Sequence, residues 1–407
     1  MVNQLTRFRI EGLHGKWNID IPIKDNKLIL VGENGSGKST VANLLFRFLS
    51  GQWRSISEAK IVAVINGDEV VCEPTPREEG GPVLNLDTSR YVVNFKQAYF
   101  LEGIDSDDDS FTAPDDFSFE KVMYLPTYRR IEQELSELLG GDTSLVDQIV
   151  RRLNKRAQAK THKELVQFGM KDVSDLIQQR LDSFMKTSRQ GLNDLTGSYL
   201  TDMIRGTMNL NVDVIAALNP EEIQAVFDRI DEKTLPNRDQ KILLELIEKI
   251  KTTREIEDGD KHVAHYLTGL VQFHQKQGQF EQDLLQFVAR VNQYLGGKQL
   301  VYNAATFELG VEDSLGEPLT FQVLSSGEKQ IISLFAHLLL SNEPHHFLMI
   351  DEPELSLSVP WQQNLLPDLL ATGRCSGMFV VTHSPFVYDN ALEAYTHSID
   401  EFVERIS

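Results

Sequence analysis

Residues 32–40 are Gly-Glu-Asn-Gly-Ser-Gly-Lys-Ser-Thr and match the pattern G-x-x-x-x-G-K-[ST]. Glycines let such a loop curl until its backbone N–H groups point inward at phosphate oxygens. Lys38 would reach the terminal phosphates of a nucleoside triphosphate, and the Ser39 hydroxyl would help to hold Mg²⁺. The alternative is a chance glycine-rich turn before a helix. The residues expected to contact the nucleotide are Asn34, Gly35, Ser36, Gly37, Lys38, Ser39 and Thr40.

An acidic pair follows a strongly apolar segment later in the chain. Residues 347–350 are Phe-Leu-Met-Ile, which predicts a strand buried on both faces, and Asp351 and Glu352 come directly after it. In open α/β sheets, ligands bind at the C-terminal ends of the strands. There Asp351 is predicted to hold Mg²⁺, and Glu352 to act as the general base on an attacking water. A helix cap or a surface pair is the alternative.

Two further segments carry polar groups at the ends of predicted elements. Ser326 and Gly327, within residues 324–330, precede an apolar helical run, so they form either an anion site or a simple helix cap. His383 follows a second apolar strand over residues 378–381, where it either hydrogen-bonds a phosphate or has a structural role. The order and spacing of the four segments carry more weight than any one of them.

The same sequence indicates the elements that position these residues. Residues 27–31 form a short apolar run that ends at Gly32, as a buried strand would, and residues 41–48 repeat apolar side chains at helical spacing. A hairpin turn is predicted at Asn66-Gly67. Further strands are predicted over residues 4–10, 17–23, 61–65, 69–73, 91–95 and, as several short ones, 299–323.

The middle of the chain differs in character. Residues 128–296 carry apolar side chains at helical spacing without sustained heptads, which predicts a compact helical domain in place of a long coiled coil. The fold class is therefore α/β, with one α/β domain that is built from both ends of the chain and interrupted by an α-helical insert. We expect residues 1–125 to form its N-terminal lobe, 126–298 the insert and 299–407 its C-terminal lobe. The acidic run 105–116 is expected to be a solvated loop.

Composition limits the remaining classes. Lysine and arginine number 40 against 60 aspartates and glutamates, and the formal charge of −20 argues against general coating of nucleic acid. The two cysteines, Cys72 and Cys375, lie far apart, so no zinc site of the usual spacing is expected. With no signal peptide and no apolar run of spanning length, the sequence predicts a cytoplasmic protein without membrane contact.

Taken in order, the segments resemble the motifs of ABC-type ATPases. Residues 32–40 resemble Walker A, 324–330 the signature motif, 347–352 Walker B with its catalytic glutamate, 353–357 the D-loop, and His383 the switch histidine. The resemblance covers both ends of the chain. It implies an ABC-type P-loop NTPase head, with a mixed sheet, flanking helices and an antiparallel β subdomain, that hydrolyses ATP with Mg²⁺.

The resemblance also implies how the chain assembles. Such heads form a head-to-tail homodimer or higher homo-oligomer with ATP sandwiched between copies, so Ser326 and Gly327 of one copy would contact the γ-phosphate held by Lys38 of the other. Hydrolysis would open the sandwich. The family's glutamine that senses Mg²⁺ and the γ-phosphate has two candidate places, Gln97, preferred here as a metal ligand, and the segment around Thr127.

The insert narrows the resemblance. Gly327 lies 327 − 38 = 289 residues after Lys38, a separation similar to that of the SMC, Rad50, RecF and OLD-like branch. Residues 351–362 resemble the OLD-like group, and residues 124–132 resemble stand-alone ATPases of the antiphage systems PARIS and Septu. This implies a sensor subunit that controls a separate toxic effector, a nuclease, with a phage protein as trigger. Because the insert lacks cysteine and only 24 residues follow His383, neither a Rad50-type zinc hook nor a fused Toprim nuclease is expected.

Two alternative functions stay open. The chain is either this sensor or a RecF- or Rad50-like DNA-repair ATPase, in which a basic cluster would track a DNA backbone. Such a cluster is otherwise a solvated helix face. A further alternative, separate from DNA repair, is a structural clamp in which ATP only holds subunits together. The basic cluster consists of Arg129, Arg130, Arg151, Arg152, Lys155, Arg156, Lys160 and Lys163.

Overall fold

The computed structural model describes residues 2–53, 56, 59–73, 83–87, 91–93, 119, 121–126, 162–164, 170–208, 210–218, 223–224, 227, 236–304 and 306–406. The chain divides into two compact units. Unit 1 comprises Met1–Met170, Ser325–Gln330 and Ser341–Ser407, and unit 2 comprises Lys171–Leu324 and Ile331–Leu340. The three-part division expected from the sequence stays a prediction.

Unit 1 contains a six-stranded sheet whose order is β15-β3-β14-β13-β8-β9 and whose neighbouring strands are all parallel. Strand β13 lies inside the sheet and all six of its residues are buried, which accounts for its apolar sequence. The strands are β3 (Lys27–Val31), β8 (Lys121–Leu125), β9 (His162–Glu164), β13 (His346–Asp351), β14 (Cys375–Val381) and β15 (Thr396–Ser398).

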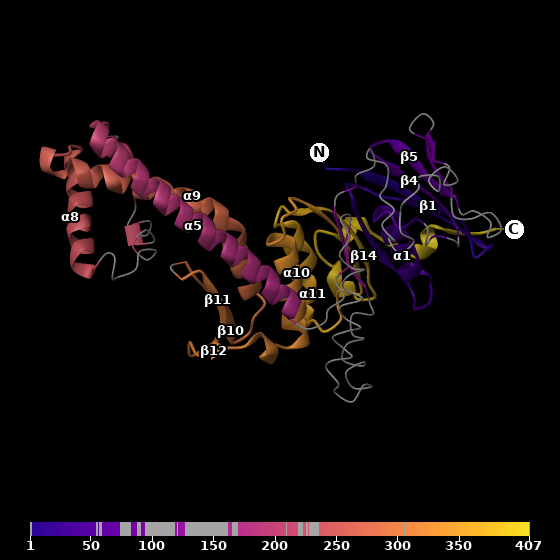
Figure 1. Ribbon diagram of the computed structural model, residues 1–407. Helices are drawn as coiled ribbons and strands as arrows, with labels where there is room; N and C mark the ends of the chain where they lie inside the picture. Colours follow the sequence, from indigo (N-terminus) through magenta and orange to yellow (C-terminus); the bar gives the residue numbers. More distant parts are fainter. Residues whose placement is uncertain are drawn as a thin grey trace, which may run out of the picture. The chain divides into compact units, whose positions relative to one another are not determined.

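A second sheet of unit 1 is antiparallel, with the order β16-β2-β1-β4-β5-β6-β7 (Figure 1). The predicted hairpin joins β4 and β5, and both turn residues, Asn66 and Gly67, have positive φ, at 55° and 92°. This is the combination that a two-residue hairpin turn requires. The strands are β1 (Leu5–Leu13), β2 (Trp17–Pro22), β4 (Lys60–Ile65), β5 (Asp68–Glu73), β6 (Val83–Asp87), β7 (Tyr91–Val93) and β16 (Val403–Arg405).

Helix α1 (Lys38–Leu49) joins the two sheets of unit 1 into one core. Val41, Leu45 and Phe48 are completely buried, and the ring of Phe48 lies 6.3 Å from that of Phe8 on β1. Each such side chain contributes about 1.5–3 kcal/mol when it leaves water. The loop before α1 is thereby fixed to a rigid support. The remaining helices that matter to unit 1 are α10 (Ser326–Leu339), whose first residues belong to it, and α11 (Val359–Leu370).

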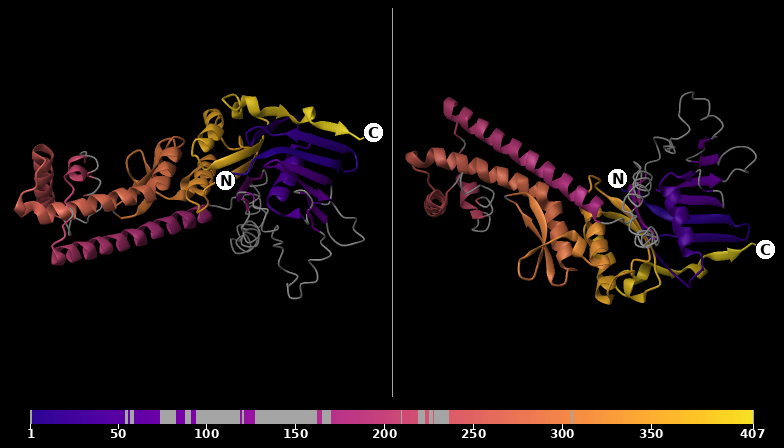
Figure 2. Two further views of the ribbon diagram at one scale, coloured as in Figure 1. Left: turned by 90° about the horizontal axis from the view of Figure 1, so that it is seen from above. Right: turned by 60° about the horizontal axis from the view of Figure 1, so that its bottom comes forward.

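Unit 2 is built on two long antiparallel helices, α5 (Lys171–Arg205) and α9 (Lys261–Asn292), which run side by side (Figure 2). Each contributes a glycine beneath a large side chain of the other. A Cβ on Gly191 would lie 2.5 Å from the Phe273 ring, and one on Gly269 would lie 2.5 Å from Leu195. The other elements are α6 (Val212–Ala216), α8 (Asn237–Thr253), β10 (Lys298–Asn303), β11 (Glu308–Asp313) and β12 (Pro318–Leu319).

The predicted α/β fold with an antiparallel β subdomain and a helical insert is confirmed, and two details of the insert are wrong. Residues 162–164 were expected to be helical but form β9, whose backbone pairs with β8. The insert was also expected to form a compact helical domain in place of a long coiled coil, because the sequence has no sustained heptads, but α5 and α9 are long helices of 35 and 32 residues. They associate through reciprocal glycine contacts, which a search for heptads does not detect. Residues 105–116 and 128–161 lie outside the described residues.

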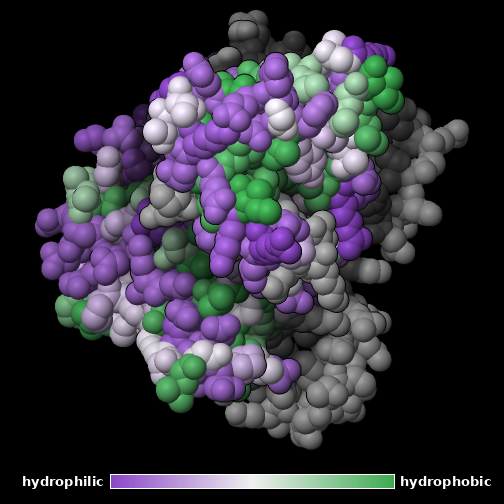
Figure 3. Space-filling model, turned by 90° about the vertical axis from the view of Figure 1, so that its left-hand side faces the viewer, coloured by the Kyte–Doolittle hydropathy of each residue, from purple (hydrophilic) through white to green (hydrophobic). Residues whose placement is uncertain are grey.

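Large apolar side chains are exposed on the helices of unit 2, where Leu200 is 53%, Ile204 86% and Ile242 56% exposed. Hydrophobic and hydrophilic residues are interspersed on the face shown in Figure 3. Among the described helices, none combines the length and the apolar character that crossing a bilayer requires.

Candidate functional site

The loop between β3 and α1 curls as the glycine pattern predicts. Gly32, Gly35 and Gly37 all have positive φ, at 154°, 82° and 93°. A Cβ on Gly32 would lie 3.1 Å from Ile399 and 3.2 Å from the Ser36 hydroxyl, so a side chain there would press on the loop. Since α1 begins at Lys38, its free N–H groups and the positive end of its dipole face the same loop. This is the geometry of a phosphate-binding loop.

Lys38 is 4% exposed and its ammonium is held by the loop itself. Nζ donates to the carbonyl oxygens of Gly32 at 2.9 Å and Glu33 at 2.7 Å, and to Ser36 Oγ at 3.2 Å. Because an ammonium has three donors, a phosphate oxygen must replace at least one of these partners. Desolvation by burial lowers the pKa of Lys38, although nearby carboxylates oppose the shift. The charge is therefore kept at a desolvation cost.

Four carboxylates lie within electrostatic reach of Lys38 and favour its charged form, Asp351, Glu352, Asp400 and Glu354 in decreasing order. An anionic triphosphate that approached Lys38 would be repelled by these four groups. A divalent cation bound with the nucleotide would offset that repulsion. The site's charges thus fit a nucleotide that arrives as its magnesium complex.

Two of the three residues expected to hold Mg²⁺, Ser39 and Asp351, are close enough to share one ion. The Ser39 hydroxyl lies 3.4 Å from Asp351 Oδ1. Adjacent oxygens of an octahedral Mg²⁺ shell with bonds of about 2.1 Å are about 3 Å apart. No group of three or more His, Cys, Asp or Glu side chains that could hold a metal occurs among the described residues. Mg²⁺ needs no such cage, because phosphates and waters complete its shell.

Glu352 directly follows β13 and has an unusual backbone. Its φ is 54°, in the left-handed region, and its N–H donates to the carbonyl oxygen of Val381 at 2.8 Å. Left-handed backbone at a residue other than glycine costs about 1–2 kcal/mol, and such residues cluster at functional sites. The Val381 bond extends the ladder between β13 and β14 and fixes where Glu352 leaves the sheet.

His383 lies just beyond β14, and its side chain is exposed. The residue before it, Thr382, is completely buried and donates its backbone N–H to the carbonyl oxygen of Leu30 on β3. The order β3-β14-β13 thus brings Lys38, Asp351, Glu352 and His383 to the C-terminal edge of one sheet. That edge is where α/β folds bind their ligands.

Ser326 and Gly327 occupy the first turn of α10, as expected. The helix cap is the preceding residue, Ser325. Its Oγ accepts from the Glu328 N–H at 3.2 Å, and its own N–H donates to Glu328 Oε2 at 2.6 Å, a capping box. Ser325 therefore supplies the helix cap, and the exposed Ser326 side chain is left available for an anion site, so the two alternatives expected for this segment fall on different residues.

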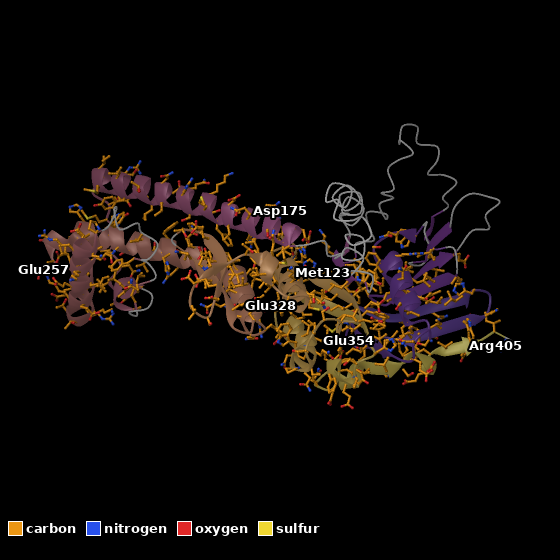
Figure 4. All side chains as sticks on the ribbon, turned by 90° about the horizontal axis from the view of Figure 1, so that it is seen from below. Met123, Asp175, Glu257, Glu328, Glu354 and Arg405 are labelled. Atoms are coloured by element: carbon orange, nitrogen blue, oxygen red, sulfur yellow. The ribbon has the colours of Figure 1, made fainter. Side chains whose placement is uncertain are left out.

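One predicted site residue, Gln97, lies outside the described residues, as do the segment around Thr127 and the basic cluster, except for the backbone of Lys163. Two acidic residues near Lys38 were not predicted as site residues, Glu354 and Asp400. Glu354 lies among the C-terminal elements drawn in yellow, and its side chain is shown with that of Glu328 in Figure 4. The position of Glu354 two residues after Glu352 could have identified it as a residue near the site, whereas nothing in the sequence around Asp400 indicates that it lies near Lys38.

Comparisons with known proteins give limited similarity. A family model described as "AAA domain, putative AbiEii toxin, Type IV TA system" matches residues 218–389, which include Asp351, Glu352 and His383 but not the loop at 32–40. No curated protein matches the chain.

Solved structures of Smc heads resemble the chain weakly. The Smc head domain with an extended coiled coil from Pyrococcus furiosus, bound to the C-terminal domain of ScpA, is 14% identical, with a TM-score of 0.41 over 100% of this chain and 96% of that one. The Smc head domain with a coiled coil and joint from Pyrococcus yayanosii is 14% identical, with a TM-score of 0.39 over 100% and 97%. An SmcHead bound to the C-winged helix domain of ScpA is 12% identical, with a TM-score of 0.40 over 95% and 91%. Similarity at this level says nothing about what this chain binds.

Proposed function

We propose that the chain binds ATP with Mg²⁺ and hydrolyses it as an ABC-type ATPase. The observation that carries the proposal is the sheet edge at which the buried Lys38 meets the Ser39–Asp351 pair, 3.4 Å apart, with Glu352 directly after Asp351. A phosphate-binding loop alone would support binding only. The acidic residues beside it supply what hydrolysis needs, a metal ligand and a base.

Each residue has a defined task in this reaction. The loop's N–H groups and Lys38 would bind the β- and γ-phosphates, while Ser39 and Asp351 would hold Mg²⁺, which would supply positive charge to neutralise the transferring phosphoryl group. The Glu352 carboxylate orients a water and accepts its proton as the water oxygen bonds to the γ-phosphorus. The bond from the γ-phosphorus to the β–γ bridging oxygen breaks, which leaves ADP and inorganic phosphate. His383 would hydrogen-bond the γ-phosphate.

Binding and turnover of the same variants separate these tasks. Lys38→Ala should weaken ATP binding roughly 10- to 150-fold, because a charge-assisted contact contributes about 1.5–3 kcal/mol. Glu352→Gln should bind ATP as the wild type does and turn over about 10²- to 10⁴-fold more slowly. Glu33→Gln is the matched control, since its exposed carboxylate belongs to the same loop and only its carbonyl binds Lys38. A Glu352→Gln variant with undiminished turnover would show that the base lies elsewhere.

We propose further that ATP brings copies of the chain together and that this state controls a separate effector in antiphage defence. Ser326 and Gly327, exposed and buried respectively at the start of α10, would contact the γ-phosphate bound by a second copy. The motif wording and the matched family's description, which names a toxin of a Type IV system, support a defence role. If ATP serves only to hold subunits together, Glu352→Gln should keep the function while trapping the assembled form.

Phage challenge tests this role. Cells that carry the gene with its natural neighbours should plate phage less efficiently than cells with an empty vector, and Lys38→Ala should remove the protection. Unchanged plating across a broad phage panel would count against defence. Strong stimulation of ATP turnover by linear duplex DNA would instead favour the DNA-repair alternative.

A further inference from the structure

The turn that follows Glu352 is fastened to the segment that carries His383. The Glu354 carboxylate accepts two hydrogen bonds, from the Thr382 hydroxyl to Oε2 and from the His383 backbone N–H to Oε1, each 2.8 Å long. Both oxygens of the carboxylate are thus engaged by consecutive residues. Hydrogen bonds to an ionised acceptor are stronger than neutral ones, so the contact fixes the His383 backbone firmly.

A second connection lies beside the first. The Thr382 hydroxyl accepts from the Ser384 N–H at 3.0 Å, and the Ser384 hydroxyl donates to Gln362 Oε1 at 2.7 Å. Gln362 in turn donates from Nε2 to the carbonyl oxygen of Leu357 at 2.9 Å. Three consecutive residues, Thr382 to Ser384, are therefore tied to the segment between Glu354 and Gln362.

The same turn also contacts the start of α10 within unit 1. Gln330 Nε2 donates to the carbonyl oxygen of Pro353 at 3.3 Å. Gly327 lies so close to the carbonyl oxygen of Ser356 that a Cβ there would be 2.4 Å away. The turn 353–357 therefore touches the predicted signature residues on one side and holds the His383 segment on the other.

Electrostatics alone would not favour a carboxylate at this place. Glu354 lies within electrostatic reach of Lys38, where it adds negative charge to a site for an anion. A carboxylate, however, only accepts hydrogen bonds, so the Thr382 hydroxyl must donate to it and keeps its lone pairs for Ser384. A glutamine amide would leave the direction of that bond open. The geometric role accounts for an otherwise unfavourable charge.

We propose that Glu354 is a positioning residue that sets the place of His383 relative to Glu352 and links both to the first turn of α10. The inference rests on the proposed ATPase function and names a residue through which the site is kept in register. Glu354 acts through His383 and touches no reacting atom.

A double-mutant cycle on the full chain tests this. Glu354→Ala should lower kcat about tenfold or more, as His383→Ala should, while the Kd for ATP stays within about threefold. In the His383→Ala background, Glu354→Ala should change kcat less than about twofold, because residues that act as a unit are not additive. Glu354→Gln should recover part of the rate, since it can still accept from the His383 N–H. Glu393→Ala, an exposed glutamate of unit 1, is the control.

Amide hydrogen exchange gives a readout that does not depend on turnover. In Glu354→Ala, the His383 and Ser384 amides should exchange about tenfold faster or more, and Glu354→Gln, which can still accept from the His383 N–H, should show a smaller increase, while the Glu393→Ala pattern stays that of the wild type. Equal loss of kcat from Glu354→Ala in both backgrounds, or unchanged exchange at these amides, would overturn the inference. Absence of turnover in the wild type would refute the ATPase proposal, and unchanged or faster exchange would then still decide whether Glu354 holds this segment.

Discussion

Replacing Gly327 by alanine probes the contact between α10 and the turn 353–357 directly. Gly327 lies in the first turn of α10 and is buried. A Cβ there would lie 2.4 Å from the Ser356 carbonyl oxygen and 3.2 Å from the Trp361 ring. The nearer atom belongs to the backbone, so it cannot move aside by a change of rotamer.

The expected loss is a balance of two opposing effects. Alanine in a helix is favoured over glycine by about 1 kcal/mol. Overpacking of a tight site costs about 1–3 kcal/mol, and the upper end applies here because a backbone oxygen is displaced. We therefore expect Gly327→Ala to lower the free energy of unfolding of unit 1 by about 2 kcal/mol, which is about a 30-fold change in the unfolding equilibrium.

Denaturant unfolding followed by tryptophan fluorescence measures this loss in the right unit. All three tryptophans, Trp17, Trp53 and Trp361, belong to unit 1. Gly197→Ala is the matched control in α5 of unit 2, because a Cβ there meets nothing within 4 Å. Gly197→Ala should raise the free energy of unfolding of unit 2, followed by helical circular dichroism, by about 1 kcal/mol, and it should leave the unfolding transition seen by tryptophan fluorescence unchanged. A Gly327→Ala variant as stable as the wild type, or more stable, would refute the close approach of Gly327 to Ser356.

Two further predictions concern stability and pH. Asn26→Ala should lower the free energy of unfolding of unit 1 by about 2–4 kcal/mol in the same assay. The buried Asn26 carboxamide makes three hydrogen bonds, and the Asn26 backbone is left-handed, at φ 58°. A loss below about 1 kcal/mol would contradict this. Burial raises the pKa of the Cys72 and Cys375 thiols to about 12 from 9.0, and Cys72 is buried whereas Cys375 is half-buried, so Cys72 should not react with a thiol reagent at mildly alkaline pH until denaturant is added and Cys375 should react slowly. Since the folded-state pKa values are raised, their contribution to stability is complete below about pH 9 and is lost as the pH rises towards 12; rapid reaction of the native protein would show that a thiol is accessible.

Local patterns of the sequence were sufficient for the elements that carry the phosphate loop. The apolar run at 27–31, the glycines at 32–37 and the helical spacing after Lys38 describe strand, loop and helix within a few turns of chain. The hairpin at Asn66-Gly67 was equally local, because both residues adopt positive φ with little cost. The composition of β13 likewise showed that it is buried on both faces.

Only the tertiary structure decided which of these elements meet. Ser39 and Asp351 were each expected to hold Mg²⁺, but their closeness depends on the place of β14 between β3 and β13, a pairing of distant strands that brings Asp351 to the Ser39 hydroxyl across 312 residues of sequence. The Glu354 contact with Thr382 spans 28 residues, and nothing near either residue announces it. The pairing of β8 with β9 and the fit of Gly191 beneath Phe273 are of the same kind.

The physical reason is the range of the interactions. Backbone propensity, turn chemistry and burial periodicity act over a few residues, so the sequence by itself determined the phosphate loop, the strand and helix that flank it and the other apolar supports of the site, whereas β9 was expected to be helical. Side-chain hydrogen bonds and close packing between distant segments depend on the whole chain's path, which local sequence does not encode. The tertiary structure therefore determined the electrostatic surroundings of Lys38 and the part that Glu354 takes in placing His383.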